Sequence, residues 1–180
     1  MILVVAATAR ELDGADGAVT VVCGIGPVEA ALATARAIVE RSPDAILHVG
    51  IAGSRTLHPP ALVLGSESIY CDVIDAQSVR PRVHTVAPDP RLLEAARLAL
   101  PEAHVAPIAT SASVGGGTAC DVEAMEGFGV LRAAALAGVP AVELRAISND
   151  VGERDRSRWR FEDALAALAA AVPRVLRALS

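Results

Sequence analysis

The chain has 180 residues, the size of one domain, which we expect to span residues 1–180. Its net charge is −5 and its arginines form no basic cluster, which argues against a nucleic-acid or anionic-membrane surface. No apolar run approaches the ~20 residues of a membrane span. Cys23, Cys71 and Cys120 are far apart, a pattern that favours free thiols in a reducing cytoplasm over a disulfide framework or a zinc site.

Short apolar runs alternate with helical patterns along the chain. Runs of strand length occur at 2–7, 19–23, 45–49, 62–70, 105–109, 119–122 and 141–147. Apolar residues at helical spacing predict helices after Pro27, Pro90 and Glu126, and from Phe161 to the end, with a kink at Pro173. Residues 71–88 show no clear pattern. The alternation predicts an α/β fold, a three-layer α/β/α sandwich around a mixed, mostly parallel central sheet.

Polar or glycine-rich segments follow several of these strands. They are Glu11, 24–26, 50–54, 110–113 and 148–150. In open α/β sheets, ligands bind beyond the carboxyl ends of the strands. We therefore expect a small molecule to bind at this edge, between the segment that begins the helix after residue 126 and the polar end of the last strand.

The two glycine motifs allow two interpretations each. Gly24 and Gly26 lie at a strand-to-helix turn, where backbone N–H groups could meet an anion or simply form a tight turn. The motif is not a dinucleotide fingerprint, because Glu29 stands where the third glycine belongs. Gly50 and Gly53 could admit a ligand close to the backbone, or only allow tight packing.

Arg145 is the most informative charged residue, because a guanidinium inside an apolar strand needs a partner. Glu143 shares its strand face and is one candidate. His48 lies in a buried strand and is expected to be a core histidine with its ring nitrogens satisfied. Trp159 and Phe161 are candidates for core or interface anchors, although the loop before the last helix could also reach a ligand.

Two isolated acidic residues also allow two interpretations each. Glu126, at a helix start, could favour the positive helix end or accept hydrogen bonds from sugar hydroxyls, with Met125 against the sugar. Glu11 is either a surface acid or a functional one. The histidines show no ligand spacing, so no metal is expected, and the absence of GxSxG argues against a serine hydrolase.

These residues, in this order, resemble the nucleoside phosphorylase/hydrolase superfamily, and within it the futalosine hydrolases. The resemblance is carried by Glu11, GIGP at 24–27, HVGIAGS at 48–54, AMEGFGV at 124–130 and AGVPAVELRAISNDVGERDRSRW at 137–159. The last two segments are the specific ones. The resemblance implies a nucleoside phosphorylase-like fold, hydrolysis of a purine N-ribosidic bond without cofactor, a nucleoside substrate, and a homo-oligomer.

The resemblance also implies roles for individual residues. Met125 and Glu126 would contact the ribose, with Glu126 on its hydroxyls. Glu11, oriented by Arg145, would position or deprotonate the attacking water. Four further residues are expected to line the site around the water and the base: Ile51, Ala52, Gly53 and Val114.

Asn149 falls where related nucleosidases have the aspartate that acts on purine N7. An amide offers both donors and an acceptor, so it suits O6 and N7 of a 6-oxopurine such as the hypoxanthine of futalosine. Asp150 is a further acid nearby, or the acting residue if the register slips by one. His48 stands where related phosphorylases have an arginine, which favours water over phosphate as the acceptor.

The chain departs from the family by being short. Residues 12–18 compress the first connection, and 115–119 replace a longer segment, so the base-side wall is expected to be open or completed by another subunit. Three alternatives to a futalosine hydrolase therefore stay open: a methylthioadenosine/S-adenosylhomocysteine nucleosidase, a purine nucleoside phosphorylase, and a non-catalytic nucleoside-binding module.

Overall fold

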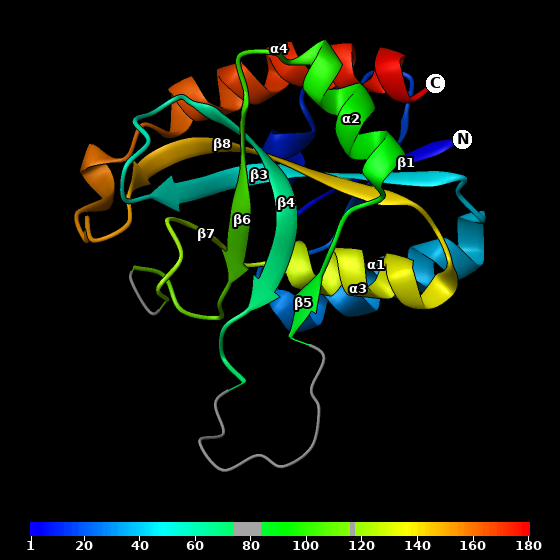
Figure 1. Ribbon diagram of the computed structural model, residues 1–180, viewed down its shortest axis with the longest axis horizontal. Helices are drawn as coiled ribbons and strands as arrows, with labels where there is room; N and C mark the ends of the chain where they lie inside the picture. Colours follow the sequence, from blue (N-terminus) through cyan, green and yellow to red (C-terminus); the bar gives the residue numbers. More distant parts are fainter. Residues whose placement is uncertain (74–83, 116–117) are drawn as a thin grey trace.

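The computed structural model describes residues 1–73, 84–115 and 118–180. In this part of the chain eight strands form one sheet with helices on both faces (Figure 1). The strands are β1 (Ile2–Ala6), β2 (Val19–Val22), β3 (Ala45–Ser54), β4 (Leu62–Tyr70), β5 (Thr85–Val86), β6 (His104–Thr110), β7 (Val122–Ala124) and β8 (Ala141–Asp150). The helices are α1 (Pro27–Arg41), α2 (Pro90–Ala99), α3 (Gly127–Ala137) and α4 (Phe161–Leu179), with 3-10 turns η1 (Ala9–Leu12) and η2 (Arg156–Arg158).

The sheet is mixed and mostly parallel, as predicted. Its order is β2-β1-β3-β7-β6-β4-β5, and β8 pairs with both β3 and β4. Among the described strands, β1–β2, β1–β3, β3–β8, β4–β6 and β6–β7 are parallel pairs, whereas β3–β7, β4–β5 and β4–β8 are antiparallel. The carboxyl ends of β1, β3 and β8 therefore lie at the same edge.

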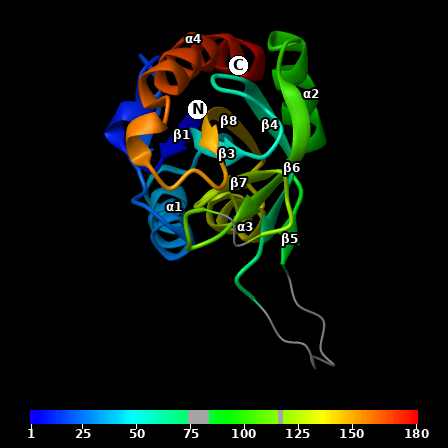
Figure 2. The same cartoon turned by 90° about the vertical axis from the view of Figure 1, so that its left-hand side faces the viewer.

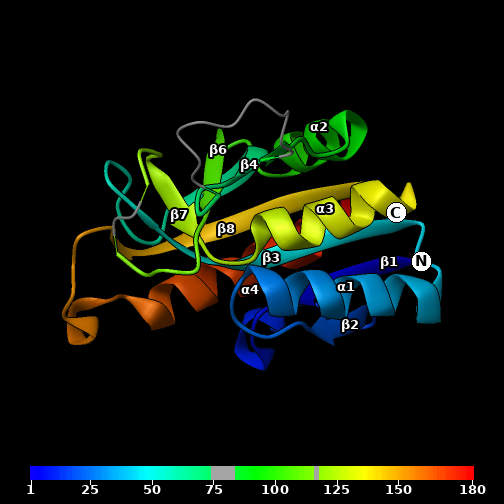
Figure 3. The same cartoon turned by 90° about the horizontal axis from the view of Figure 1, so that it is seen from below.

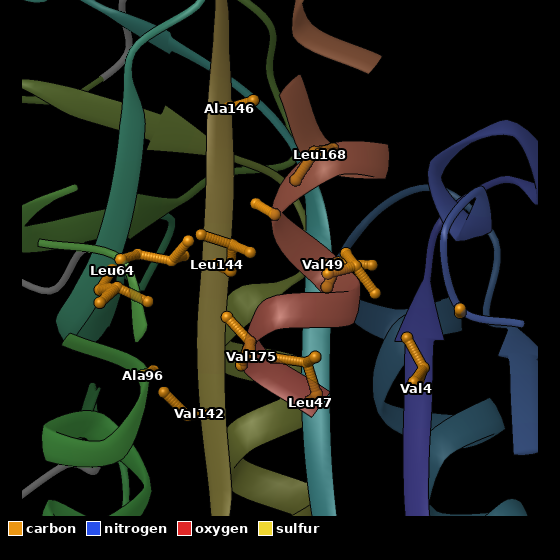
Figure 4. Close-up of a cluster of buried hydrophobic side chains, with 14 of the residues drawn as sticks. Val4, Leu47, Val49, Leu64, Ala96, Val142, Leu144, Ala146, Leu168 and Val175 are labelled. Atoms are coloured by element: carbon orange, nitrogen blue, oxygen red, sulfur yellow. The ribbon is translucent and has the colours of Figure 1, made fainter. Parts of the chain in front are cut away.

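The predicted three layers are confirmed. Helices α2 and α4 cover one face of the sheet and α1 and α3 the other (Figures 1 and 2). Figure 3 shows α1 and α3 side by side across β1, β3 and β8. On β8, Val142, Leu144 and Ala146 point into the apolar core under α4 (Figure 4). Because side chains alternate along a strand, Glu143 and Arg145 point to the opposite face, toward α3.

Strands β3 and β8 are longer than their apolar runs predict. Their polar ends pair with each other, Gly53 with Asn149 and Ser54 with Asp150, so backbone hydrogen bonding continues where the apolar pattern stops. The register shifts between Ala52 and Gly53, which leaves Ser148 as an extra, bulged residue.

Smaller differences concern the connections. The strand expected at 119–122 begins only at Val122, and 85–86 of the unassigned segment pair with β4, while 74–83 lie outside the described residues. Helix α4 continues through Pro173.

Cys23 is buried and the other two free cysteines are half-buried. None of the helices in the described ranges is long and apolar enough to cross a bilayer.

Candidate functional site

A cavity of about 470 Å³ opens at the edge where β1, β3 and β8 end. Eight of the residues expected at the site line it: Glu11, Ile51, Ala52, Gly53, Val114, Met125, Glu126 and Asn149. They come from η1, β3, the loop after β6, the end of β7, and β8. Segments more than 100 residues apart in the chain thus converge on one cavity, as the strand-end argument predicts.

Glu11 is held by three hydrogen bonds. Its Oε1 accepts from the backbone N–H of Ile51 at 3.0 Å, and its Oε2 accepts from the backbone N–H and the hydroxyl of Thr8 at 2.9 and 2.8 Å. The side chain is only 5% exposed, yet it borders the cavity. A carboxylate fixed in this way presents its remaining lone pairs in a set direction. Thr8, on which this orientation depends, was not anticipated from the sequence.

Glu126 directly precedes α3, is buried and lines the cavity. Its Oε1 accepts from the backbone N–H of Gly26 at 3.1 Å, and its Oε2 lies 3.4 Å from Nη1 of Arg145. The glycine turn before α1 therefore does bind an anion through its backbone, and that anion is the protein's own carboxylate. Gly26 has φ +96°, a conformation that favours glycine.

Arg145 is fully buried and has a partner on each nitrogen. Nε donates to Glu143 at 2.8 Å, Nη1 contacts Glu126 and the carbonyl of Ile51 at 3.4 Å each, and Nη2 lies 2.6 Å from Nε2 of His48. The pairing with Glu143 expected from their shared face is confirmed. Arg145 does not line the cavity, and it connects to Glu11 through the backbone of Ile51, whose N–H that glutamate binds.

His48 is the satisfied core histidine that the sequence predicts. Its Nδ1 lies 2.9 Å from the carbonyl of Val5, so Nδ1 carries the hydrogen and Nε2 accepts from Arg145. Burial, together with the charge of Arg145, holds the pKa of His48 well below its ordinary value. The ring is thus neutral and serves as a support for the guanidinium.

Glu143 lies at the far side of the same cluster. Burial raises the pKa of this carboxyl above its ordinary value, although Arg145 opposes the shift. Its Oε2 is a buried side-chain oxygen without a hydrogen-bond partner among the described residues. A β-carbon added to Gly127 would lie 2.4 Å from Oε1 of Glu143, so this carboxyl packs directly against the residue that follows Glu126.

Asn149 is 8% exposed, and its amide is oriented by neighbours on β8. The hydroxyl of Ser148 donates to Oδ1 at 2.8 Å, and Nδ2 donates to the carbonyl of Asp150 at 3.0 Å. The reverse amide orientation would place an oxygen against that carbonyl, which is unfavourable. The second N–H of Nδ2 has no acceptor among the described residues. Asp150 is exposed, and its side chain does not line the cavity.

The cavity has further walls that the sequence indicated weakly or not at all. Trp159 and Phe161 line it, so the loop before the last helix does reach the site. Glu123, a buried acid on β7, also borders it and accepts a hydrogen bond from Arg55 at 2.9 Å. No motif in the sequence marked Glu123, whose partners include Thr118, five residues earlier, and the distant Arg55. Within the described residues, no three His, Cys, Asp or Glu side chains cluster in a way that could bind a metal ion.

Residues 7–180 match the model of the phosphorylase superfamily, and the chain belongs to this superfamily. A stretch of 50 residues is 68% identical to the futalosine hydrolase of Streptomyces coelicolor and covers 28% of this chain and 21% of that protein. A stretch of 55 residues is 51% identical to the futalosine hydrolase of Thermus thermophilus, covering 31% and 24%. The matches thus span about a quarter or less of these curated relatives.

Solved structures are similar over nearly the whole chain. The S-adenosylhomocysteine nucleosidase of Streptococcus pyogenes, in complex with 5-methylthiotubericidin, has a TM-score of 0.85 at 20% identity, covering 99% of this chain and 97% of that one. The futalosine hydrolase of Helicobacter pylori has a TM-score of 0.85 at 17% identity, covering 99% and 96%. These similarities show that this chain has the same α/β fold as the nucleosidase structures.

We predict that His48 makes stability fall with acidity. The unfolded chain binds a proton on this residue below about pH 6.5, whereas the folded chain does not, so the free energy of unfolding decreases as the pH drops. The loss is at most about 1.4 kcal/mol for each pH unit below the pKa of the unfolded chain. Urea denaturation of the wild type and of His48→Asn at pH 7.5, 6 and 5 measures it.

The variant should have a shallower pH dependence than the wild type over this interval, whatever its stability at pH 7.5. Exposed His58 supplies the control, because His58→Gln should leave the wild-type slope unchanged. Equal slopes for the wild type and His48→Asn would show that His48 is protonated in the folded protein.

Proposed function

We propose that this protein is a nucleosidase that hydrolyses the N-ribosidic bond of futalosine and releases hypoxanthine, as a step of menaquinone biosynthesis. The observation that carries the proposal is the convergence of Glu11, Glu126 and the Asn149 amide on one cavity of about 470 Å³. A cavity of this size is typical of small-molecule sites. The identity of segments to named futalosine hydrolases supports the same substrate.

Cleavage of an N-ribosidic bond leaves positive charge on the sugar and an electron-rich purine. In the proposed complex Glu126 accepts hydrogen bonds from the ribose hydroxyls, and Met125 lies against the sugar. Glu11 holds or deprotonates the water that attacks the anomeric carbon. Both carboxylates are preorganised by hydrogen bonds to the protein, so little reorganisation is needed when charge develops. General base assistance of this type contributes about 10²–10⁴-fold.

We assign the binding of the purine base to Asn149. Its second N–H can bind an acceptor of the leaving purine, N7 or O6, and its orientation is fixed by Ser148 and the carbonyl of Asp150. A 6-oxopurine offers acceptors on both atoms, which suits a donor. This geometry favours Asn149 over Asp150 as the residue that acts on the base, because the Asp150 side chain is not in the cavity wall.

Water is the proposed acceptor instead of phosphate. A phosphorylase needs a cationic anchor for phosphate, and His48 cannot supply one, since it is neutral, fully buried and occupied by Arg145 and the carbonyl of Val5. The direct experiment incubates the pure protein with futalosine and follows hypoxanthine by chromatography, with and without phosphate. Release without phosphate is expected. Strict phosphate dependence would indicate a phosphorylase, and binding without turnover a nucleoside-binding module.

We predict that Glu126→Gln lowers kcat/KM about 100-fold or more, because it removes the charged acceptor of the ribose hydroxyls while keeping the side-chain volume. The hypoxanthine-release assay measures the effect, and circular dichroism checks that the fold is retained. Glu29, an exposed residue of α1, supplies the matched control, and Glu29→Gln should behave as the wild type. Wild-type turnover by Glu126→Gln would remove this residue from the ribose site.

Asn149→Asp should shift base preference from hypoxanthine toward adenine. A carboxylate repels the O6 acceptor of hypoxanthine but accepts a hydrogen bond from the amino group of adenine. Rates on a 6-oxopurine nucleoside and its adenine counterpart measure the ratio, with Asp150→Asn as the companion variant. An altered ratio in Asp150→Asn, together with an unchanged ratio in Asn149→Asp, would transfer the role to Asp150.

A homo-oligomer and a cytoplasmic location remain parts of the proposal. Free cysteines are compatible with a reducing compartment. Helix α1 and the strand before it expose a stripe of large apolar residues that a second copy could cover: Val22, Ile25, Val28, Leu32 and Val39.

We predict that Leu32→Arg reduces the oligomer to a smaller species in light scattering coupled to gel filtration. An unchanged mass would place the interface elsewhere.

A further inference from the structure

The buried guanidinium of Arg145 makes two short contacts and two long ones. Nε donates to Glu143 at 2.8 Å, and Nη2 lies 2.6 Å from Nε2 of His48. Nη1 is 3.4 Å from Glu126 and 3.4 Å from the carbonyl of Ile51. The two long contacts are to residues that line the cavity, whereas the two short ones are to residues that do not. The cation is therefore bound tightly behind the cavity and loosely beside it.

The carboxyl of Glu143 is fixed by packing as well as by its hydrogen bond. The side chain is fully buried. A β-carbon on Gly127 would meet both of its oxygens, and a β-carbon on Gly65 would lie 3.4 Å from Oε2. The backbones of α3 and β4 thus enclose the carboxyl, and its Oε2 has no hydrogen-bond partner among the described residues. Because the carboxyl has no room to turn away, its contact with Arg145 is built into the fold.

The contact supplies more than an acceptor for Nε, which a neutral side chain would also supply. In the described part of the chain, Arg145 forms salt bridges with Glu143 and Glu126 alone. His48 is held neutral by burial, so it contributes no counter-charge. A buried cation requires a counter-charge, and without Glu143 that partner would be Glu126.

A tight ion pair with Arg145 would compete with any ligand of Glu126. Oε1 of Glu126 already accepts from the N–H of Gly26 at 3.1 Å. If Oε2 were taken up by the guanidinium as well, the carboxylate would be a weaker acceptor for sugar hydroxyls. The observed separation of 3.4 Å between Oε2 and Nη1 is what a counter-charge on the other side of the guanidinium permits.

We propose that Glu143 is a positioning residue for ribose recognition: its carboxylate supplies the counter-charge of Arg145, so that the carboxylate of Glu126 stays available to the sugar hydroxyls. Glu143 touches no substrate and acts through Arg145. The inference rests on the proposed function only in placing a ribose beside Glu126. It gives a role in the site to a carboxyl that lies outside the cavity wall.

Glu143→Gln removes the charge and keeps an oxygen that can accept from Nε of Arg145. The readout is kcat/KM on inosine divided by kcat/KM on 2′,3′-dideoxyinosine, which lacks both ribose hydroxyls. This ratio should fall about tenfold in the variant, because Arg145 then pairs with Glu126 and one charge-assisted hydrogen bond to the ribose is weakened. The assays are run at about pH 8.5, since burial raises the pKa of Glu143 and the proposed role needs its ionised form.

Two further variants complete the comparison. Glu143→Asp keeps the charge, and its ratio should lie closer to that of the wild type than to that of Glu143→Gln. Glu102→Gln is the matched control, because Glu102 is an exposed glutamate that pairs with Arg174 away from the cavity, and it should leave the ratio unchanged.

Three results would overturn the positioning role. The first is an equal ratio in the wild type and in Glu143→Gln, and the second is the same drop in Glu143→Asp as in Glu143→Gln. The third is loss of the folded state in both Glu143 variants, seen by circular dichroism, which would assign Glu143 to stability alone.

A double-mutant cycle tests whether Glu143 acts through Glu126. On inosine, Glu143→Gln should cause no further loss of kcat/KM in a Glu126→Gln background, because the acceptor that it keeps available is already gone. Additive losses from the two substitutions would contradict the inference.

A binding arm separates this inference from the proposed function. Where inosine is not cleaved, the ratio is taken from the Kd values of the two nucleosides, followed by the fluorescence of Trp159, the single tryptophan, which lines the cavity. The wild type should prefer inosine, and Glu143→Gln should reduce that preference about tenfold. No preference in the wild type, or an undiminished one in the variant, would overturn the inference. Failure to cleave futalosine ends the proposed function and leaves this test intact, whereas cleavage with an unchanged ratio ends the inference alone.

Discussion

The buried guanidinium of Arg145 is the constraint on which the cavity depends. An ionised group removed from water is costly unless its hydrogen bonds are complete, and Arg145 cannot be neutralised by losing a proton. Its partners come from β3, β8 and the start of α3. Satisfying it therefore fixes these three elements relative to one another. Glu126 and Ile51, which belong to the cavity wall, are positioned as a consequence.

The same constraint explains two glycines of the sequence motifs. A β-carbon on Gly50 would lie 2.2 Å from Nη1 of Arg145 and 3.0 Å from Oε1 of Glu11, and one on Gly127 would meet the carboxyl of Glu143. These glycines make room for the protein's own charged side chains. Of the two interpretations of the 50–53 motif, packing is correct at Gly50, while Gly53 also borders the cavity.

The predictable parts of the structure follow from local patterns. The alternation of apolar and helical segments was sufficient to predict the three layers. The shared face of Glu143 and Arg145 was sufficient to predict their ion pair. The contacts that orient the site were not predictable in this way. The hydrogen bond from Gly26 to Glu126 joins residues 100 positions apart, and the support of Glu11 by Thr8 depends on a 3-10 turn that has no periodic signature.

The choice between Asn149 and Asp150 could not be made by counting residues along the sequence. Side chains alternate along a strand, so a shift of one residue exchanges the face that each presents. Ser148 is an extra residue in the pairing of β8 with β3, and a bulge of this kind redirects the side chains that follow it. Because the bulge places the amide in the cavity wall and the next carboxylate outside it, the base recognition that we propose depends on an irregularity that only the paired strands reveal.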